Sequence, residues 1–146
     1  ISGETSSAAL SRLEWMLNTD PDIVIIETGG NDGLRGVDLD LTEQNIAEIV
    51  AAFEESGAIV ILGGLQIIQN LGPEYTEQFA NMYPQIAAAH PDVIFIPFIL
   101  EGVAADPNLN QDDFIHPTAE GYTVMVDHIY PFVQEAIARH QETATQ

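Results

Sequence analysis

The stretch that decides the fold is "DIVIIETGG", residues 22–30, in which four consecutive β-branched aliphatic residues lead into a pair of glycines. A short apolar run bounded by turn residues is typical of a strand that is buried on both faces. Two further runs have the same character: "AIVILGGLQ", residues 58–66, and "DVIFIPFIL", residues 92–100. The sequence therefore predicts three buried strands that begin about 35 residues apart.

Helical periodicity fills the intervals around these runs. Apolar residues recur at three- and four-residue spacing over residues 6–18, 42–56, 74–90 and 118–140, which predicts four helices. Strands that alternate with helices favour a parallel sheet with right-handed crossovers and helices on both faces. No linker or low-complexity tract interrupts the pattern, so we expect an α/β fold in one domain over residues 1–146.

The composition excludes several classes of partner. Three basic residues stand against 23 acidic ones, and the net charge is −20 at pH 7, which makes nucleic acid and anionic membranes poor partners. Because salt at ~1 M shortens the screening length to about 3 Å, such a surface suggests the hypothesis of a halophilic, salt-adapted source. The lack of cysteine excludes disulfides, thiolate metal sites and a cysteine nucleophile. No apolar run approaches the ~20 residues that a membrane-spanning helix needs.

A candidate binding loop follows the first predicted strand. Open parallel sheets bind ligands beyond the carboxyl ends of their strands, and "ETGGNDGLRG", residues 27–36, lies at such an end. Glycines let a backbone approach a ligand closely, and Asn31 offers a side-chain amide donor. The alternative is a glycine-rich turn in which Asn31 or Asp32 caps the following segment. No lysine follows, so the stretch does not fit a phosphate-binding loop.

A candidate acid–base pair occurs in "QDDFIHPTAEGY", residues 111–122, where Asp113 precedes His116 by three positions. A carboxylate within hydrogen-bond reach fixes the tautomer of a histidine and stabilises its imidazolium, which a general base requires. Thr118 can cap the helix that follows, and Gly121 can pack back on the loop. The alternative is a surface turn with an incidental ion pair.

Two other polar stretches carry weaker signals. "DPNLNQDD", from Asp106, has oxygen ligands at alternate positions but lacks the glycine and the bidentate glutamate of a calcium loop, so we expect a solvated acidic loop and no metal site. "SGETSS", from Ser2, reads as a turn into a capped helix, with the N–H of Gly3 free. Ser2, Ser6 and Ser7 are nucleophile candidates only in the sense that every hydroxyl is.

Three of these stretches together resemble a known family. "SGETS" at Ser2, "GGND" at Gly29 and "DDFIHPTAEGY" at Asp112 are similar to the second, third and fifth conserved blocks of the SGNH (GDSL-type) hydrolases, in the same order. "SGETSSAALSRLEWML" and "ETGGNDGLRG" further resemble the branch of acyl-CoA thioesterase I, arylesterase and lysophospholipase. The resemblance implies a three-layer α/β/α, flavodoxin-like fold, no cofactor, and a periplasmic or secreted location.

The same resemblance implies roles for four residues. Gly3 would give a backbone N–H and Asn31 a side-chain N–H to an oxyanion hole, His116 would be the base, and Asp113 would orient it. The implied reaction is hydrolysis of a carboxylic ester or thioester of an acyl substrate by a serine. The loop "LQIIQNLGPEY", residues 65–75, is more apolar than a sugar cleft usually is, and it favours an acyl-chain site.

The family's nucleophile block is missing, because Gly-Asp-Ser occurs nowhere in the 146 residues. In a family-like sheet with strand order 2-1-3-4-5, the absent segment would include the central strand, and the run at Ile23 would have an open edge. We therefore expect an N-terminally incomplete domain whose serine comes from upstream, on a companion chain from a cleaved precursor or on a region outside this sequence. A catalytically inactive binding or scaffolding remnant, or a carbohydrate acetylesterase of the same fold, remain as alternatives.

Overall fold

A parallel sheet forms the centre of the protein, in a computed structural model that describes residues 1–67 and 71–143. Its strands are β1 (Ile23–Ile26), β2 (Ile59–Gly63) and β3 (Ile94–Ile96), in the order β1-β2-β3. The register runs from Ile23 opposite Ile59 to Ile26 opposite Leu62, and β3 pairs in parallel with the other edge of β2. The predicted α/β class and parallel sheet are confirmed.

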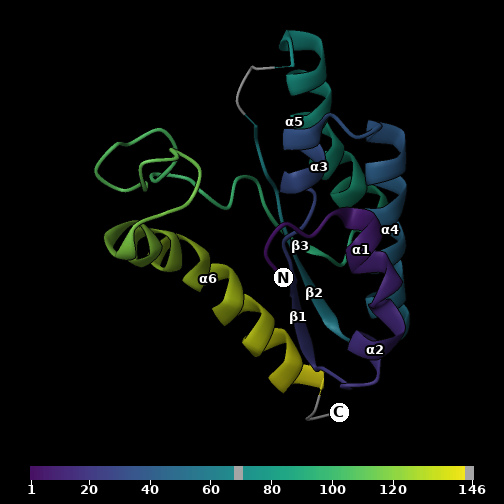
Figure 1. The fold of residues 1–146 in the computed structure, drawn as a ribbon. Helices are drawn as coiled ribbons and strands as arrows, with labels where there is room; N and C mark the ends of the chain where they lie inside the picture. Colours follow the sequence, from purple (N-terminus) through teal and green to yellow (C-terminus); the bar gives the residue numbers. More distant parts are fainter. Residues whose placement is uncertain (68–70, 144–146) are drawn as a thin grey trace.

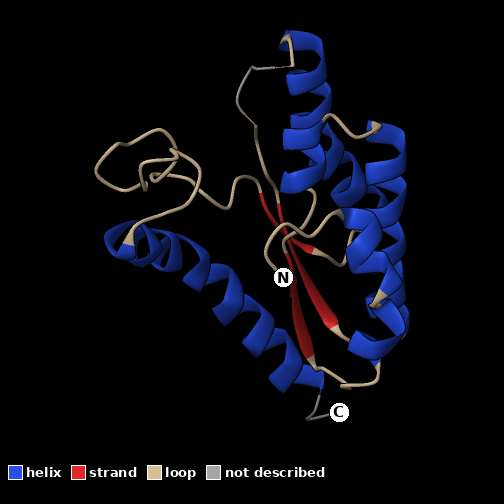
Figure 2. Cartoon of the chain, viewed as in Figure 1, coloured by secondary structure: helices blue, strands red, loops and turns tan. Residues whose placement is uncertain are grey.

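Helices cover both faces of this sheet (Figures 1 and 2). The helices among the described residues are α1 (Ser6–Ser11), α2 (Leu13–Leu17), α3 (Gly30–Arg35), α4 (Leu39–Glu55), α5 (Pro73–Ala89) and α6 (Ala119–Thr143). The long helix α6 lies on one face, and α1, α4 and α5 lie on the other. The chain therefore has the three layers that were expected.

The two halves of the core follow from the alternation of side chains along the strands. Val60 and Leu62 of β2 point into the cluster shared with α4 and α5. Ile61 points the other way, where it packs with Ile94 and with Ala136 of α6. Apolar residues on both faces of β2 thus bind the two helical layers to one sheet.

The first predicted helix, over residues 6–18, is not continuous. The structure breaks it at Arg12, whose backbone leaves the helical region at φ −101° and ψ 1°. Just before the break, the hydroxyl of Ser11 donates to the carbonyl of Ala8, and such bonding of a serine back to its own helix bends helices. The Arg12 side chain turns back to bind Glu4. The break matters for the site, because it lets Arg12 contact the turn that contains Gly3.

The glycine-rich stretch after β1 forms the short helix α3, and the reading of Asn31 or Asp32 as a cap is wrong. The cap residue is Gly29, whose φ of 100° lies in the region that glycine adopts readily. A Cβ at this position would also come within 2.6 Å of the Tyr83 hydroxyl. Asn31 and Asp32 therefore lie inside the first turn of α3, and their side chains bond to other segments.

The free edge of β1 departs from the prediction of three strands buried on both faces. Ile25 is 47% exposed, whereas β2 is buried along nearly its whole length. Ile25 shares its face of the sheet with Ile23, which packs on the α6 side. Helix α6 carries further exposed apolar residues at helical spacing, namely Tyr122, Val126, Tyr130 and Ile137. None of the helices in the described residues is long and apolar enough to cross a membrane.

Candidate active site

The predicted pair of Asp113 and His116 forms in the loop between β3 and α6. Oδ2 of Asp113 lies 2.7 Å from Nδ1 of His116. Oδ1 of the same carboxylate accepts the backbone N–H groups of Ile115 at 2.9 Å and of His116 at 3.0 Å. The turn closes through Phe114, whose φ of 58° is left-handed. One carboxylate thus organises the whole turn around the imidazole.

These contacts define the electrostatics of the pair. The pKa of Asp113 falls from 3.8 to about 2, because its carboxylate accepts the backbone N–H of His116, then the imidazole, then the N–H of Ile115. An ionised carboxylate at Nδ1 holds the proton of a neutral imidazole on that nitrogen, which leaves Nε2 as a proton acceptor. Nε2 of His116 has no hydrogen-bond partner within the described residues, and the side chain is 65% exposed. The pair can therefore serve as an oriented base.

Short-range bonds anchor this loop to the start of α6. The N–H of Gln111 donates to the carbonyl of His116 at 2.8 Å, and its side-chain amide donates to the carbonyl of Pro117. The hydroxyl of Thr118 accepts the N–H of Gly121 at 3.2 Å, so Thr118 caps α6 as predicted. The loop is built by its own backbone and amide groups.

Gly3 lies in an exposed turn before α1. Its φ of 75° is left-handed, and its carbonyl accepts Nη2 of Arg35 at 3.1 Å. Its N–H has no acceptor among the described residues, and the residue is exposed. Thr5 caps the helix that follows by accepting the N–H of Ala8, which confirms the predicted turn into a capped helix.

Asn31 lies against the same turn. Its Nδ2 donates to the carbonyl of Glu4 at 3.0 Å. A side-chain amide carries two N–H groups, so this bond fixes its orientation and leaves the second N–H available. The structure thus places the Asn31 side chain of α3 against the turn that contains Gly3, at the carbonyl of the next residue, Glu4.

The two halves of the predicted site are not joined by hydrogen bonds or ion pairs in the described residues. Within residues 1–67 and 71–143, no hydrogen bond or ion pair links Asp113 or His116 to Gly3 or Asn31. Figure 1 shows the loop before α6 standing apart from α3 in this view. No serine of the described part hydrogen-bonds to a histidine ring, and Ser6 is buried. The convergence of all four residues on one carbonyl group stays a prediction.

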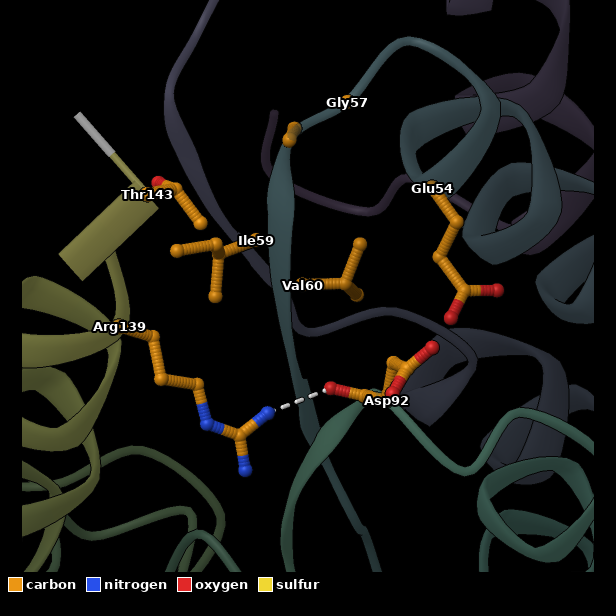
Figure 3. Close-up of a pocket in the computed structure, with 8 residues that line it drawn as sticks. Glu54, Gly57, Ile59, Val60, Asp92, Arg139 and Thr143 are labelled. Carbon is orange, nitrogen blue, oxygen red and sulfur yellow. Dashed lines mark hydrogen bonds between the residues drawn. The ribbon is translucent and has the colours of Figure 1, made fainter. Parts of the chain in front are cut away.

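A pocket of about 280 Å³ lies elsewhere, at the amino ends of β2 and β3 (Figure 3). Glu54, Asp92 and Arg139 line it, and Nη1 of Arg139 donates to the carbonyl of Asp92 at 2.7 Å. None of the four predicted site residues contributes to its lining. Ligands of open parallel sheets bind at the opposite, carboxyl ends of the strands, so this pocket is not assigned as the active site.

Sequence reasoning missed the residues that hold the Gly3 turn in place. Arg12 binds both carboxylate oxygens of Glu4, at 2.7 and 2.9 Å, and this bond holds the pKa of Glu4 below its usual value. Arg35 binds the carbonyl of Gly3. The chain has only three arginines and no lysine, and two of them bind this single turn. Because basic residues are so scarce in the sequence, Arg12 and Arg35 could have been singled out as residues with a structural role.

Comparisons with known proteins find relatives for most of this chain. The GDSL-like Lipase/Acylhydrolase family matches residues 1–124. The chain is 39% identical over 132 residues to Esterase TesA of Pseudomonas aeruginosa, covering 90% of this chain and 65% of TesA. It is 34% identical over 141 residues to an Arylesterase of Vibrio mimicus, covering 96% of this chain and 68% of that protein. A crystal structure of TesA matches with a TM-score of 0.87 and 37% identity, over 93% of this chain and 76% of that one. The chain thus spans about two thirds of the length of these curated relatives.

Proposed function

Because the chain belongs to the GDSL-like Lipase/Acylhydrolase family, we propose that it supplies the base and the oxyanion hole of a serine hydrolase acting on carboxylic esters or thioesters. The observation that carries the proposal is the 2.7 Å contact between Asp113 and His116, which leaves Nε2 without a partner in the described residues. The names of the relatives, an esterase and an arylesterase, support the class of reaction.

The nucleophile of this reaction is a serine on a segment outside residues 1–146. Gly-Asp-Ser is absent from the sequence, whereas β1 is an edge strand of the sheet in the described residues and its Ile25 is exposed. A parallel strand added at this edge would end beside Asn31, and it would cover apolar surface such as Ile25. We propose that its serine then lies between the Gly3 turn and the His116 loop.

The chemistry then follows from the geometry of the four residues. Nε2 of His116 accepts the proton of the serine hydroxyl while Asp113 stabilises the imidazolium, and the serine oxygen bonds to the acyl carbonyl carbon. The resulting oxyanion accepts the N–H groups of Gly3 and Asn31. The imidazolium returns the proton to the departing alcohol or thiol. Water, deprotonated by the same imidazole, then attacks the acyl carbonyl carbon, and the imidazolium returns this proton to the serine oxygen as the bond between the acyl group and the serine breaks.

The apolar loop over residues 65–75 supports an acyl-chain site, and Leu65 at its start is buried. Residues 68–70 lie outside the described residues, so the shape of this site stays a prediction. Aryl esters are the natural first substrates, because one relative is named an arylesterase.

The experiment that tests the proposal uses a polypeptide that joins these residues to the serine segment. We expect it to hydrolyse p-nitrophenyl acetate or butyrate, and we expect Asn31→Ala to lower kcat on the order of 10² to 10³ by removing one oxyanion donor. Asn18→Ala, at the exposed end of α2, is the matched control and should keep full activity. Full activity of Asn31→Ala would remove that residue's role. No turnover by the unsubstituted polypeptide would favour an inactive remnant.

A further inference from the structure

Asp32 is a fully buried carboxylate next to Asn31, with a relative exposure of 0%. Its Oδ2 accepts the backbone N–H of Ser6 at 2.8 Å, and its Oδ1 accepts the Ser6 hydroxyl at 2.6 Å. The hydroxyl of Thr42 approaches Oδ1 at 3.3 Å. Within the part of the chain that the structure describes, no arginine or histidine is paired with Asp32.

The charge of Asp32 cannot itself favour the reaction. Burial, followed by the nearby carboxylate of Asp32, raises the pKa of the Tyr83 hydroxyl. A carboxylate beside an oxyanion hole repels the negative charge that develops there. Burying a carboxylate without a cation is also costly unless hydrogen bonds satisfy it. The role of Asp32 therefore lies in the geometry that its hydrogen bonds impose.

The hydrogen bonds of Asp32 join the two segments that carry the oxyanion donors. Ser6 lies three residues after Gly3, and Asp32 directly follows Asn31. The two bonds between Ser6 and Asp32 thus span 26 residues of sequence and connect the start of α1 to the first turn of α3. From α4, Nδ2 of Asn45 donates to the Ser6 hydroxyl at 3.0 Å and holds it in place.

Other bonds between the same segments are more accessible to water. Arg35 reaches the carbonyl of Gly3 at an exposed position, and Asn31 reaches the carbonyl of Glu4 at a partly buried one. Water competes for exposed hydrogen bonds, whereas buried ones hold their geometry because breaking them leaves polar groups unsatisfied. The bonds between Ser6 and Asp32 are the buried part of this connection.

We propose that Asp32 is a positioning residue that, through Ser6, sets the separation between the Gly3 N–H and the Asn31 amide. Its meaning for catalysis rests on the proposed function, because only there do these two groups bind an oxyanion. The positioning of these two groups by Asp32 is inferred from the hydrogen bonds alone.

Kinetics of matched variants in the complete enzyme test the catalytic part. Ser6→Ala removes the hydroxyl that joins α1 to Asp32, and we expect kcat to fall ~10-fold to ~100-fold with KM within about twofold, because small displacements of catalytic groups are costly. Thr42→Val removes a hydroxyl from the same buried carboxylate, but its bond joins α3 to α4. We expect Thr42→Val to lower the melting temperature while kcat stays within about twofold. Equal losses of kcat in both variants would overturn the proposal.

Amide signals in ¹H–¹⁵N spectra of the same proteins test the geometric part without activity. We expect the Gly3 backbone amide and the Asn31 side-chain amide to shift in Ser6→Ala and to stay in place in Thr42→Val. Ser7→Ala controls for closeness in sequence, because Ser7 bonds to Asn45 but not to Asp32. Unmoved Gly3 and Asn31 signals in Ser6→Ala would overturn the inference, whatever the activity. Shifted signals in an enzyme without turnover would refute the proposed function and keep the inference.

Discussion

Hydrogen bonds fix the side chain of Asp113 although this side chain is exposed to solvent. Its side chain is 45% exposed, yet it accepts hydrogen bonds from two backbone N–H groups and from the imidazole of His116. Each of these donors favours the ionised form, so the pKa falls to about 2. A depressed pKa means that this carboxylate stabilises the folded turn above pH ~4, and that the contribution is lost as the pH falls through about 2.

Titration of Asp113 tests this account. At pH 3 we expect its carboxyl group to remain ionised, whereas an aspartate with the ordinary pKa of 3.8 would be mostly protonated. His116→Ala removes the imidazole but keeps both backbone donors, so the pKa should rise only part of the way to 3.8. Carbon-13 NMR of the aspartate carboxyl groups measures both values. A complete return to 3.8 in His116→Ala would show that the backbone bonds do not matter.

The loop that contains Asp113 and His116 packs closely against the start of the helix α6. Gly121, in the first turn of α6, is buried against the loop, and a Cβ there would overlap the carbonyl oxygen of Leu109 and lie 3.0 Å from Cβ of Pro117. Glycine therefore allows the helix and the loop to approach closely. Since His116 immediately precedes Pro117, the position of its imidazole depends on this contact.

Gly121→Ala is expected to weaken this junction. The added methyl group must displace backbone, so we expect a loss of about 1–3 kcal/mol in the free energy of unfolding. Activity should fall in parallel, because the loop that contains His116 moves. Urea denaturation followed by circular dichroism measures the stability. Glu120→Ala, the preceding exposed position, is the control and should remain close to the unsubstituted protein. Equal midpoints for the two variants would contradict the close approach.

At the scale of the whole molecule, the charge of −20 dominates the surface. All three arginines are engaged: Arg12 binds Glu4, Arg35 binds the Gly3 carbonyl, and Arg139 binds Glu135 and the Asp92 carbonyl. Few positive charges therefore offset the mutual repulsion of the acidic side chains, and dissolved salt becomes the main source of screening.

The melting temperature should consequently rise steeply with NaCl concentration, up to ~1 M, as screening shortens the range of repulsion. The triple variant Glu48→Gln, Glu77→Gln, Glu142→Gln removes three exposed negative charges, so its melting temperature should be higher at low salt and should rise less with NaCl. Differential scanning calorimetry at several salt concentrations gives the slopes. A flat response in the unsubstituted protein would remove the hypothesis of salt adaptation.

Several confirmed predictions concern residues that are close to one another in the sequence. Asp113 and His116 meet because a three-residue turn places them within reach, and Thr118 caps α6 because it directly precedes that helix. The resemblance to the GDSL-type family is confirmed for the same reason, since its blocks are short and contiguous. The helix α3 was missed because its glycine-rich sequence is a poor helix former, and contacts from other segments determine its conformation.

The sequence by itself indicated the strands, the parallel sheet and the local pair of imidazole and carboxylate. The strands and the sheet follow from apolar runs that alternate with helical periodicity, and the pair follows from residues three positions apart. Only the tertiary structure decided that Asp32 bonds to Ser6, that Asn31 and Arg35 hold the Gly3 turn, and that Ile25 remains exposed. These features depend on which distant segments come to lie together. Burial and hydrogen bonding across such distances are properties of the folded chain, and no local pattern encodes them.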